Sequence, residues 1–276
     1  MSRRIAVFAF SLVLAACTSS PDPRPELYSK GERYLSSGLI HYKKDNFSAA
    51  QINFYRALML YQSVDHSTGT QLARINLLES LLALNDFTAA EEHLDILKHQ
   101  KTNTELSERI ILLETKLLFK KQLYSEALAT IEALLLALNQ REKIDNKQLE
   151  WLATAARLES LVATEAKYLW VTRYRTALLK KNNVQAKFQV ALKRIDANIA
   201  TQNQQYPKAL GLLHEALGYY KSQGHRRAIA ACYEEMAAIE NKQQHHQQEL
   251  KYLKRALTIR IWLKDQYHID IIQKKL

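Results

Sequence analysis

Residues that make turns are scarce in this sequence, which has 276 residues but only 6 glycines and 4 prolines. Pro21, Pro23 and Pro25 lie close together near the N-terminus, so Pro207 is the single proline in the rest of the chain. An all-β protein or a doubly wound α/β protein would need more turn residues. Alanine, leucine, lysine, glutamine and glutamate are abundant instead, and they favour helix almost everywhere. We therefore expect an all-α protein.

Cysteine is also scarce, because the chain has only Cys17 and Cys232. If Cys17 carries a lipid, as argued below, Cys232 has no partner for an intramolecular disulfide. Cys232 lies in AIAACYEEM, whose alanines follow a helical pattern. We interpret it as a small buried apolar residue.

Linear motifs of catalysis are absent as well. No glycine pattern of a nucleotide-binding loop occurs, and no serine lies in a G-x-S-x-G elbow. His245 and Glu249 are four residues apart, with His246 between them, and could offer two metal ligands on one helix face. The HExxH order is missing, however, and the surrounding NKQQHHQQE is typical of a solvated turn. We expect no catalytic residue, no metal and no cofactor.

Basic residues outnumber acidic ones, 39 against 28, for a formal net charge of +11. Without Arg3 and Arg4, which lie in a segment that we expect to be removed, the net charge is +9. Such a surface suits contact with anionic lipid, an anionic polymer or an acidic protein. The sequence has no arginine cluster and no basic stripe interleaved with aromatic residues, so we expect no nucleic-acid partner.

The N-terminal sequence MSRRIAVFAFSLVLAAC has two arginines followed by a mostly apolar run at 5–16. This order is typical of a secretory signal, and the run is shorter than the ~20 residues that span a bilayer. It ends in LAAC (14–17), which closely resembles the bacterial lipoprotein box. The resemblance implies that residues 1–16 are a signal peptide and that Cys17 is lipidated.

The residue after Cys17 is Thr18 rather than aspartate. By the sorting rule of enterobacterial lipoproteins, this implies the outer membrane, with the protein facing the periplasm. Several acyl chains on the cysteine would hold the protein stably on the membrane. The prolines that follow oppose helix, so we expect residues 17–27 to be the lipidated cysteine and an extended tether.

Five segments of the chain share one pattern. They are DNFSAAQINFYRAL (45–58), NDFTAAEEHLDIL (85–97), QLYSEALATIEAL (122–134), QQYPKALGLLHEAL (204–217) and QHHQQELKYLKRAL (244–257). In most of them an aromatic residue or histidine is followed by a small residue, then a large apolar one, then a small or apolar one. The aromatic positions are separated by 40, 37, 82 and 40 residues, and the interval of 82 predicts a hidden repeat that turns near Glu165. Self-similarity at this period indicates a helical solenoid.

The pattern resembles the tetratricopeptide repeat. Gly38 occupies the close-packing position of a first helix, Phe47 lies at the turn, and Ala50, Phe54 and Ala57 follow on a second helix. The small residues would let neighbouring helices approach, and the large ones would fill the gaps. The resemblance implies an all-α solenoid of about five to six helical hairpins.

We expect this tetratricopeptide-repeat-like solenoid to cover residues 28–263, with residues 264–276 as a C-terminal capping segment. The period is longer than the usual ~34 residues, so either the helices or the connecting loops must be longer. We expect SVDHSTGTQ, at 63–71, to be one such loop.

In the repeat family, the first helix of each hairpin lines a concave groove that binds a partner. By the register of the first, third and fifth repeats, the resemblance implies these groove residues: Glu32, Leu35, Leu39, Tyr42, Lys43, Arg109, Leu112, Lys116, Phe119, Lys120, Arg194, Asn198 and Gln202. Their mixture of apolar, aromatic and cationic groups suits an extended or helical peptide with some acidic character.

We therefore expect a lipid-anchored adaptor that binds a protein or peptide partner of the cell envelope. Candidate assemblies are those of pili or secretion, outer-membrane protein insertion, and cell-wall synthesis. The alternative is an envelope protein that binds glycan or another anionic polymer, or an enzyme whose site leaves no linear motif. The sequence leaves the oligomeric state open.

Overall fold

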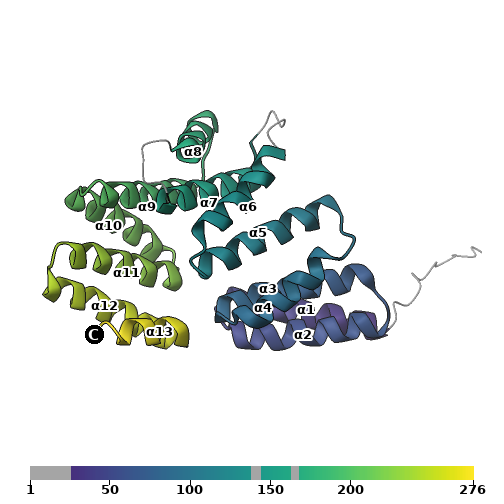
Figure 1. Ribbon diagram of the computed structural model, residues 1–276. Coiled ribbons are helices and arrows are strands. Elements are labelled where there is room, and N and C mark those ends of the chain that lie inside the picture. The colour runs from purple at the N-terminus through teal and green to yellow at the C-terminus, as the bar shows by residue number, and fades with distance from the viewer. Residues whose placement is uncertain (1–25, 138–143, 163–167) are drawn as a thin grey trace, which may run out of the picture.

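The computed structural model describes residues 26–137, 144–162 and 168–276, and the described chain consists of helices without strands (Figure 1). The helices are α1 (Glu26–Lys43), α2 (Phe47–Ser63), α3 (Ser67–Leu84), α4 (Phe87–Lys98), α5 (Thr104–Lys120), α6 (Tyr124–Ala137), α7 (Asn146–Val162), α8 (Leu169–Lys180), α9 (Ala186–Gln202), α10 (Tyr206–Ser222), α11 (Arg226–Lys242), α12 (His246–Trp262) and α13 (Gln266–Gln273). The predicted signal peptide and Cys17 lie outside the described residues. The last two residues of the predicted tether, Glu26 and Leu27, begin α1.

Helices α1 to α12 pair into six successive hairpins, and the short helix α13 follows them. This arrangement confirms the expected all-α helical-repeat fold. The hairpin of α7 and α8 lies where the interval of 82 residues predicted a hidden repeat. Among the described residues, none of the helices combines the length and apolar character that crossing a bilayer requires.

The repeated sequence pattern accounts for the packing inside each hairpin. In α2, Ala50, Phe54 and Ala57 are almost completely buried, and the equivalent positions of α4, α6, α10 and α12 are buried as well, apart from the half-buried Glu249 of α12. Gly38 of α1 lies directly against the ring of Phe54, and a Cβ atom at this position would come within 2.4 Å of the ring. The close approach of α1 and α2 therefore depends on glycine at position 38.

The connections between consecutive helices are mostly short turns, and one residue in most of them has a positive φ. Asn85, for example, has a φ of 61° and ends α3, and the next residue, Asp86, accepts a hydrogen bond from the Ala89 amide at the start of α4. Most of these residues are aspartate, asparagine or glutamine rather than glycine. This use of other residues explains how a chain with so few glycines can make so many turns.

The prediction of a long loop at 63–71 was wrong. Helix α2 continues to Ser63 and α3 already begins at Ser67. Asp65 takes the positive φ of the turn, and His66 Nδ1 accepts a hydrogen bond from the Gly69 amide at a distance of 3.0 Å. The long repeat period therefore results from helices of up to 18 residues rather than from an extended loop at this place.

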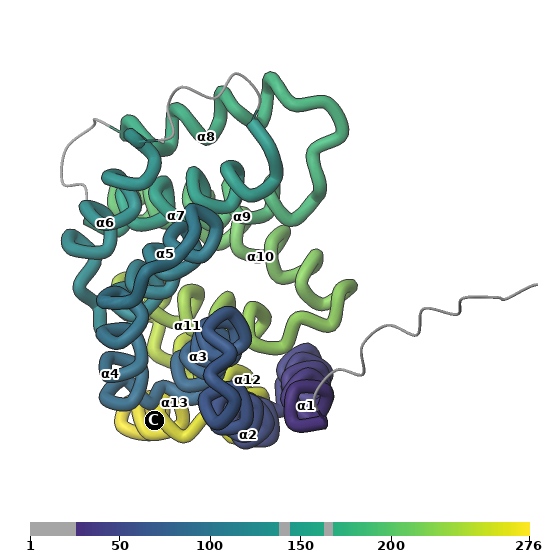
Figure 2. The backbone as a smooth tube through the Cα atoms, turned by 90° about the vertical axis from the view of Figure 1, so that its right-hand side faces the viewer, coloured from purple at the N-terminus to yellow at the C-terminus, as the bar shows by residue number. Residues whose placement is uncertain are grey.

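The stack of hairpins curves until its two ends meet. Figures 1 and 2 show α13 beside the hairpin of α3 and α4, although the two are far apart in sequence. Asn85 Nδ2 donates a hydrogen bond to Asp265 Oδ1 at 3.0 Å, and Arg227 Nη2 donates one to the Ala83 carbonyl at 3.0 Å. Phe87 and Tyr267 pack edge to face with ring centroids 5.6 Å apart. We call these residues, which join the last helices to the early hairpins, the closure interface.

Candidate functional site

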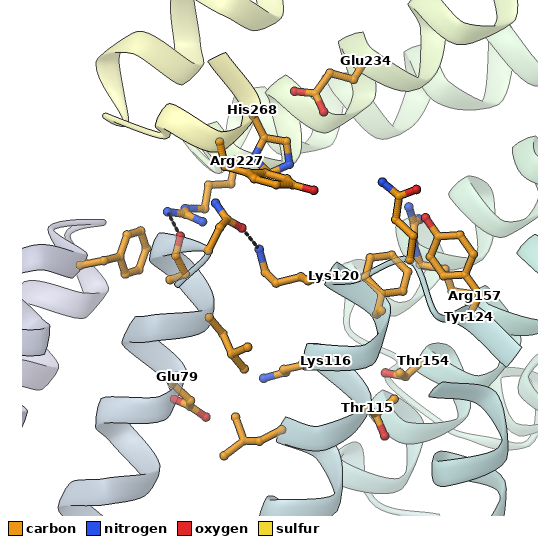
Figure 3. Close-up of a pocket in the computed structure, with 18 of the residues that line it drawn as sticks. Glu79, Thr115, Lys116, Lys120, Tyr124, Thr154, Arg157, Arg227, Glu234 and His268 are labelled. Atoms are coloured by element: carbon orange, nitrogen blue, oxygen red, sulfur yellow. Dashed lines mark hydrogen bonds between the residues drawn. The ribbon is translucent and has the colours of Figure 1, made fainter. Parts of the chain in front are cut away.

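The curved stack encloses a central cavity of about 710 Å³. The first helix of every hairpin contributes to its lining, and so does α13, as the sequence register predicted for first helices. Figure 3 shows the lining side chains pointing into this space from several helices. The residues that line the cavity are Tyr42, Phe47, Glu79, Leu82, Ala83, Asn85, Leu113, Thr115, Lys116, Phe119, Lys120, Gln122, Tyr124, Ala153, Thr154, Arg157, Ala191, Arg227, Glu234, Tyr267, His268 and Ile271.

Lys120, at the end of α5, lies against the closure interface. Its ammonium group donates a hydrogen bond to Asn85 Oδ1 at 2.8 Å, which Figure 3 marks with a dashed line from Lys120. The Nδ2 atom of the same amide donates to Asp265 Oδ1. Burial lowers the pKa of Lys120 to about 8, the charges of Arg227 and Arg260 add to this effect, and Asp265 opposes it. The protein therefore holds this cation in a place that disfavours its charge.

Arg227 enters the cavity from α11. Its guanidinium carbon lies 4.0 Å from the centre of the Phe47 ring, and Nη2 binds the Ala83 carbonyl. The Nε atom is buried without a hydrogen-bond partner. Burial also lowers the pKa of Arg227 from its usual value, although Asp265 and Asp45 oppose the shift. Arg227 thus joins the early hairpins to α11 through neutral groups.

Asp265 is the buried carboxylate of the closure interface. Its oxygens accept hydrogen bonds from Arg260 Nη1 and His268 Nδ1, both at 2.9 Å, in addition to the bond from Asn85. Burial alone would raise the pKa of Asp265, but the hydrogen bond from His268 and the nearby positive charges bring it to about 2. The carboxylate is therefore ionised and fully engaged within the protein.

A second ion cluster joins α7, α9 and α11 next to the cavity. Glu235 of α11 accepts a hydrogen bond from Arg157 of α7 at 2.7 Å and pairs with Arg194 of α9. Burial would raise the pKa of Glu235, but the charges and hydrogen bonds of Arg194 and Arg157 lower it to about 2. The cluster joins three first helices that line the same cavity.

Four of the predicted groove residues line the cavity, namely Tyr42, Lys116, Phe119 and Lys120. Tyr42 packs edge to face on Phe47, and burial followed by the charge of Glu79 raises its pKa to about 12. Lys116 is exposed to the cavity, and Phe119 packs against Tyr124. The structure thus brings together one predicted residue of α1 and three of α5.

The predicted residues of the fifth repeat do not line the cavity. Arg194 pairs with Glu235, Asn198 approaches Ser160, and Gln202 donates a hydrogen bond to the Ser160 carbonyl at 2.8 Å. This face of α9 is turned toward α7 and α11, so these side chains join helices within the solenoid. Their role in partner binding stays a prediction.

The remaining predicted residues also lie outside the cavity lining. Leu35 and Leu112 pack against the apolar core, and Arg109 donates a hydrogen bond to Asn76 and approaches Glu79. Glu32 lines a separate depression on α1. Leu39 and Lys43 are exposed.

Sequence reasoning missed the cavity residues that the later helices contribute. Glu234, Arg227 and His268 lie on α11 and α13, where no groove residue was predicted, and Thr154 and Arg157 lie on the weakly patterned α7. The signal that could have found Glu234 is the family register itself, extended to the first helix of the sixth hairpin. Arg227 lies near the start of that helix and falls outside this register.

Other residues outside the cavity have ordinary roles. Cys232 is buried and free, as predicted, and burial raises the pKa of its thiol to about 11. His245 Nδ1 lies 2.9 Å from Glu240 Oε2, and His246 Nδ1 lies 3.6 Å from Glu249 Oε2. Across the described ranges, the acidic, histidine and cysteine side chains form no group of three suited to a metal ion.

The sequence matches no protein-family model and no curated protein. Solved structures do match. One, described as a Rap protein complexed with competence and sporulation factor, has a TM-score of 0.61 and 14% sequence identity, and the match covers 88% of this chain and 69% of that chain. Another is a tetratricopeptide repeat protein from Parabacteroides merdae, with a TM-score of 0.50, 13% identity, and coverage of 89% and 99%. This chain therefore has the fold of a tetratricopeptide-repeat-like helical solenoid.

Proposed function

We propose that this chain is a non-enzymatic adaptor that binds a segment of a protein partner in its central cavity. The observation that carries the proposal is the cavity itself, which the first helices of all six hairpins line together with α13. A cavity of this kind offers apolar, aromatic and charged groups over several repeats, which suits an extended or helical peptide. The Rap neighbour, solved as a complex with its factor, is another example of this fold with a bound molecule.

The proposed location is the periplasmic face of a bacterial outer membrane, with the lipid on Cys17 as the anchor. The support comes from the sequence alone, from the apolar signal, the LAAC motif and Thr18 after the cysteine. An anchored adaptor would position its partner in an envelope assembly for pili or secretion, outer-membrane protein insertion or cell-wall synthesis.

In-cell crosslinking tests the binding function. A photo-reactive amino acid replaces Thr154, which faces the cavity in Figure 3, in the full-length chain. The matched control carries the same amino acid at Leu179 of α8, which is 88% exposed and does not line the cavity. We expect a discrete crosslinked partner from position 154 only. The same products from both positions, or none from either despite efficient activation, would contradict the proposal.

Fractionation tests the location separately. Wild-type protein should partition with outer membranes and incorporate labelled palmitate, whereas Cys17→Ser should lose the label and leave the membrane fraction. Membrane association of the serine variant, with no label on the wild-type protein, would contradict lipid anchoring while leaving the cavity proposal untouched.

A further inference from the structure

Three cations of the cavity lack an ionic partner. Within the described ranges, no carboxylate oxygen lies within 4.0 Å of the charged nitrogens of Lys116, Lys120 or Arg227. The hydrogen-bond partners of Lys120 and Arg227 are neutral, an amide oxygen of Asn85 and the carbonyl of Ala83. These charges are thus held in place without being neutralised.

The carboxylates of the same cavity are occupied by other cations. Glu234 accepts hydrogen bonds from Arg260 Nε and Nη2 at 2.8 and 3.2 Å, and Glu79 lies 3.4 Å from Arg109 Nη2. Neither of these arginines lines the cavity. The fourth cation of the lining, Arg157, is already paired with Glu235. The uncompensated charge of the cavity is therefore positive.

The surroundings strengthen the attraction of these cations for an anion. Apolar residues such as Leu82, Leu113 and Phe119 line the cavity beside them, and a low local dielectric increases the energy of an ionic contact. Lys120 and Arg227 also repel each other, because the charge of Arg227 helps to lower the pKa of Lys120, and the opposing effect of Asp265 on Lys120 is the smaller of the two. An anion in the cavity near both cations would relieve this repulsion.

We infer that the part of the cavity lined by Lys116 and Lys120 of α5 and Arg227 of α11 is a binding site for an oxyanion. Its occupant is a carboxylate of an acidic segment of the partner, so this inference rests on the proposed function. Guanidinium and ammonium groups together recognise carboxylates through charge-assisted hydrogen bonds. Because Lys120 belongs to the third hairpin and Arg227 to the sixth, the bound carboxylate would also link these two hairpins across the cavity.

Calorimetric titration of the purified protein, with its signal peptide removed and Cys17 replaced by serine, tests the site. The probes are an acetylated, amidated tetraglutamate peptide, its tetraglutamine counterpart and inorganic phosphate. We expect tetraglutamate to bind and to raise the melting temperature, and tetraglutamine to do neither. Lys120→Met should weaken tetraglutamate binding at least tenfold.

Two further variants show that charge rather than packing is responsible. Lys120→Arg keeps the cation and should retain binding to within about threefold. Lys208→Met removes an exposed lysine of α10 that lies outside the cavity lining, and binding should stay within twofold of wild type. Equal binding by wild type and Lys120→Met, or no binding of either anion to the wild type, would overturn the inference.

The remaining outcomes separate this inference from the proposed function. Phosphate binding that depends on Lys120, without peptide binding, would support the oxyanion site but assign it to a free anion and overturn the peptide carboxylate as its occupant. Conversely, if position 154 captures the same partner equally well in wild-type and Lys120→Met cells, the adaptor function stands and the oxyanion site is overturned.

Discussion

At the scale of single residues, the packing of the first hairpin depends on a missing side chain. Gly38 is buried against Phe54, and an added Cβ would overlap the ring. We expect Gly38→Ala to destabilise the protein by about 1–3 kcal/mol, as overpacking of a core typically does. Gly218 is the control, because a Cβ there has no neighbour within 4 Å, and alanine should stabilise α10 by about 0.5–1 kcal/mol. Urea denaturation measures both, and a loss of the same size at the two positions would contradict this account.

Lys120 makes a residue-scale prediction about pH. Its pKa in the folded protein is about 8, below the usual 10.5, so the unfolded chain binds this proton more tightly. Between these values the unfolded state carries more protons, and the stability of the folded state therefore rises with pH. We expect Lys120→Met to be more stable than wild type at pH 7, and this difference to shrink by pH 9.5. Urea denaturation at several pH values measures it.

Lys116→Met is the control for this prediction, because it removes a neighbouring lysine of α5 that is exposed to the cavity. The stability difference between Lys120→Met and wild type should change more over this range of pH than the difference between Lys116→Met and wild type. A pH-independent difference for Lys120→Met would show that burial of Lys120 does not disfavour its charge.

At the scale of the helices, a turn that places a residue other than glycine at positive φ can be stabilised by glycine. Gln204 has a φ of 57° between α9 and α10 and is exposed. A left-handed conformation costs most L-residues ~1–2 kcal/mol, which glycine avoids, although glycine loses part of this gain through its greater freedom in the unfolded chain. We expect Gln204→Gly to raise the free energy of unfolding by about 0.5–1 kcal/mol. Gly224 has a φ of 67° in the turn between α10 and α11, and Gly224→Ala should lower the free energy of unfolding by a similar amount in the same denaturation series.

The ion cluster between α7, α9 and α11 should matter more than pairs on the surface. Glu235→Gln leaves Arg157 and Arg194 partly buried without a counter-charge, and we expect a loss of about 3 kcal/mol. Glu215→Gln removes an exposed pair with Lys193, and the loss should stay below about 0.5 kcal/mol. Chemical denaturation near pH 7 measures the free energy of unfolding of both variants. Equal losses would show that the cluster stabilises the protein no more than an exposed ion pair does.

The sequence predicted most of the hairpins because small and large apolar residues recur at fixed positions on their second helices. The sequence pattern was weakest for the fourth hairpin, because α8 does not have a small residue at the expected position. Trp170, Tyr174 and Ala177 are buried at the spacing of Ala50, Phe54 and Ala57, but a tryptophan stands in the place of a small residue. A pattern search for small residues therefore gives little signal there, although the packing is equivalent.

At the scale of the whole molecule, the candidate site could be predicted only in part. Tyr42, Lys116, Phe119 and Lys120 followed from the register of a helical hairpin, which is a local property. The bond between Asn85 and Asp265 joins positions 180 residues apart. Such a contact depends on the curvature of the whole solenoid, which accumulates from a small rotation at each repeat. A local sequence pattern does not predict this accumulated curvature. The sequence could therefore suggest a groove but could not show that its ends meet.

The central claim is that the two ends of the solenoid meet and close the cavity, and a distance measurement between them tests this most directly. Spin labels at the exposed positions Thr88 of α4 and Gln266 of α13 lie on opposite sides of the closure interface. We predict one narrow distance distribution, centred on the separation in the closed structure, which broadens in the variant Asp265→Ala. A broad distribution, or one centred at a much longer distance, in the wild-type protein would contradict the closed solenoid and the site built on it.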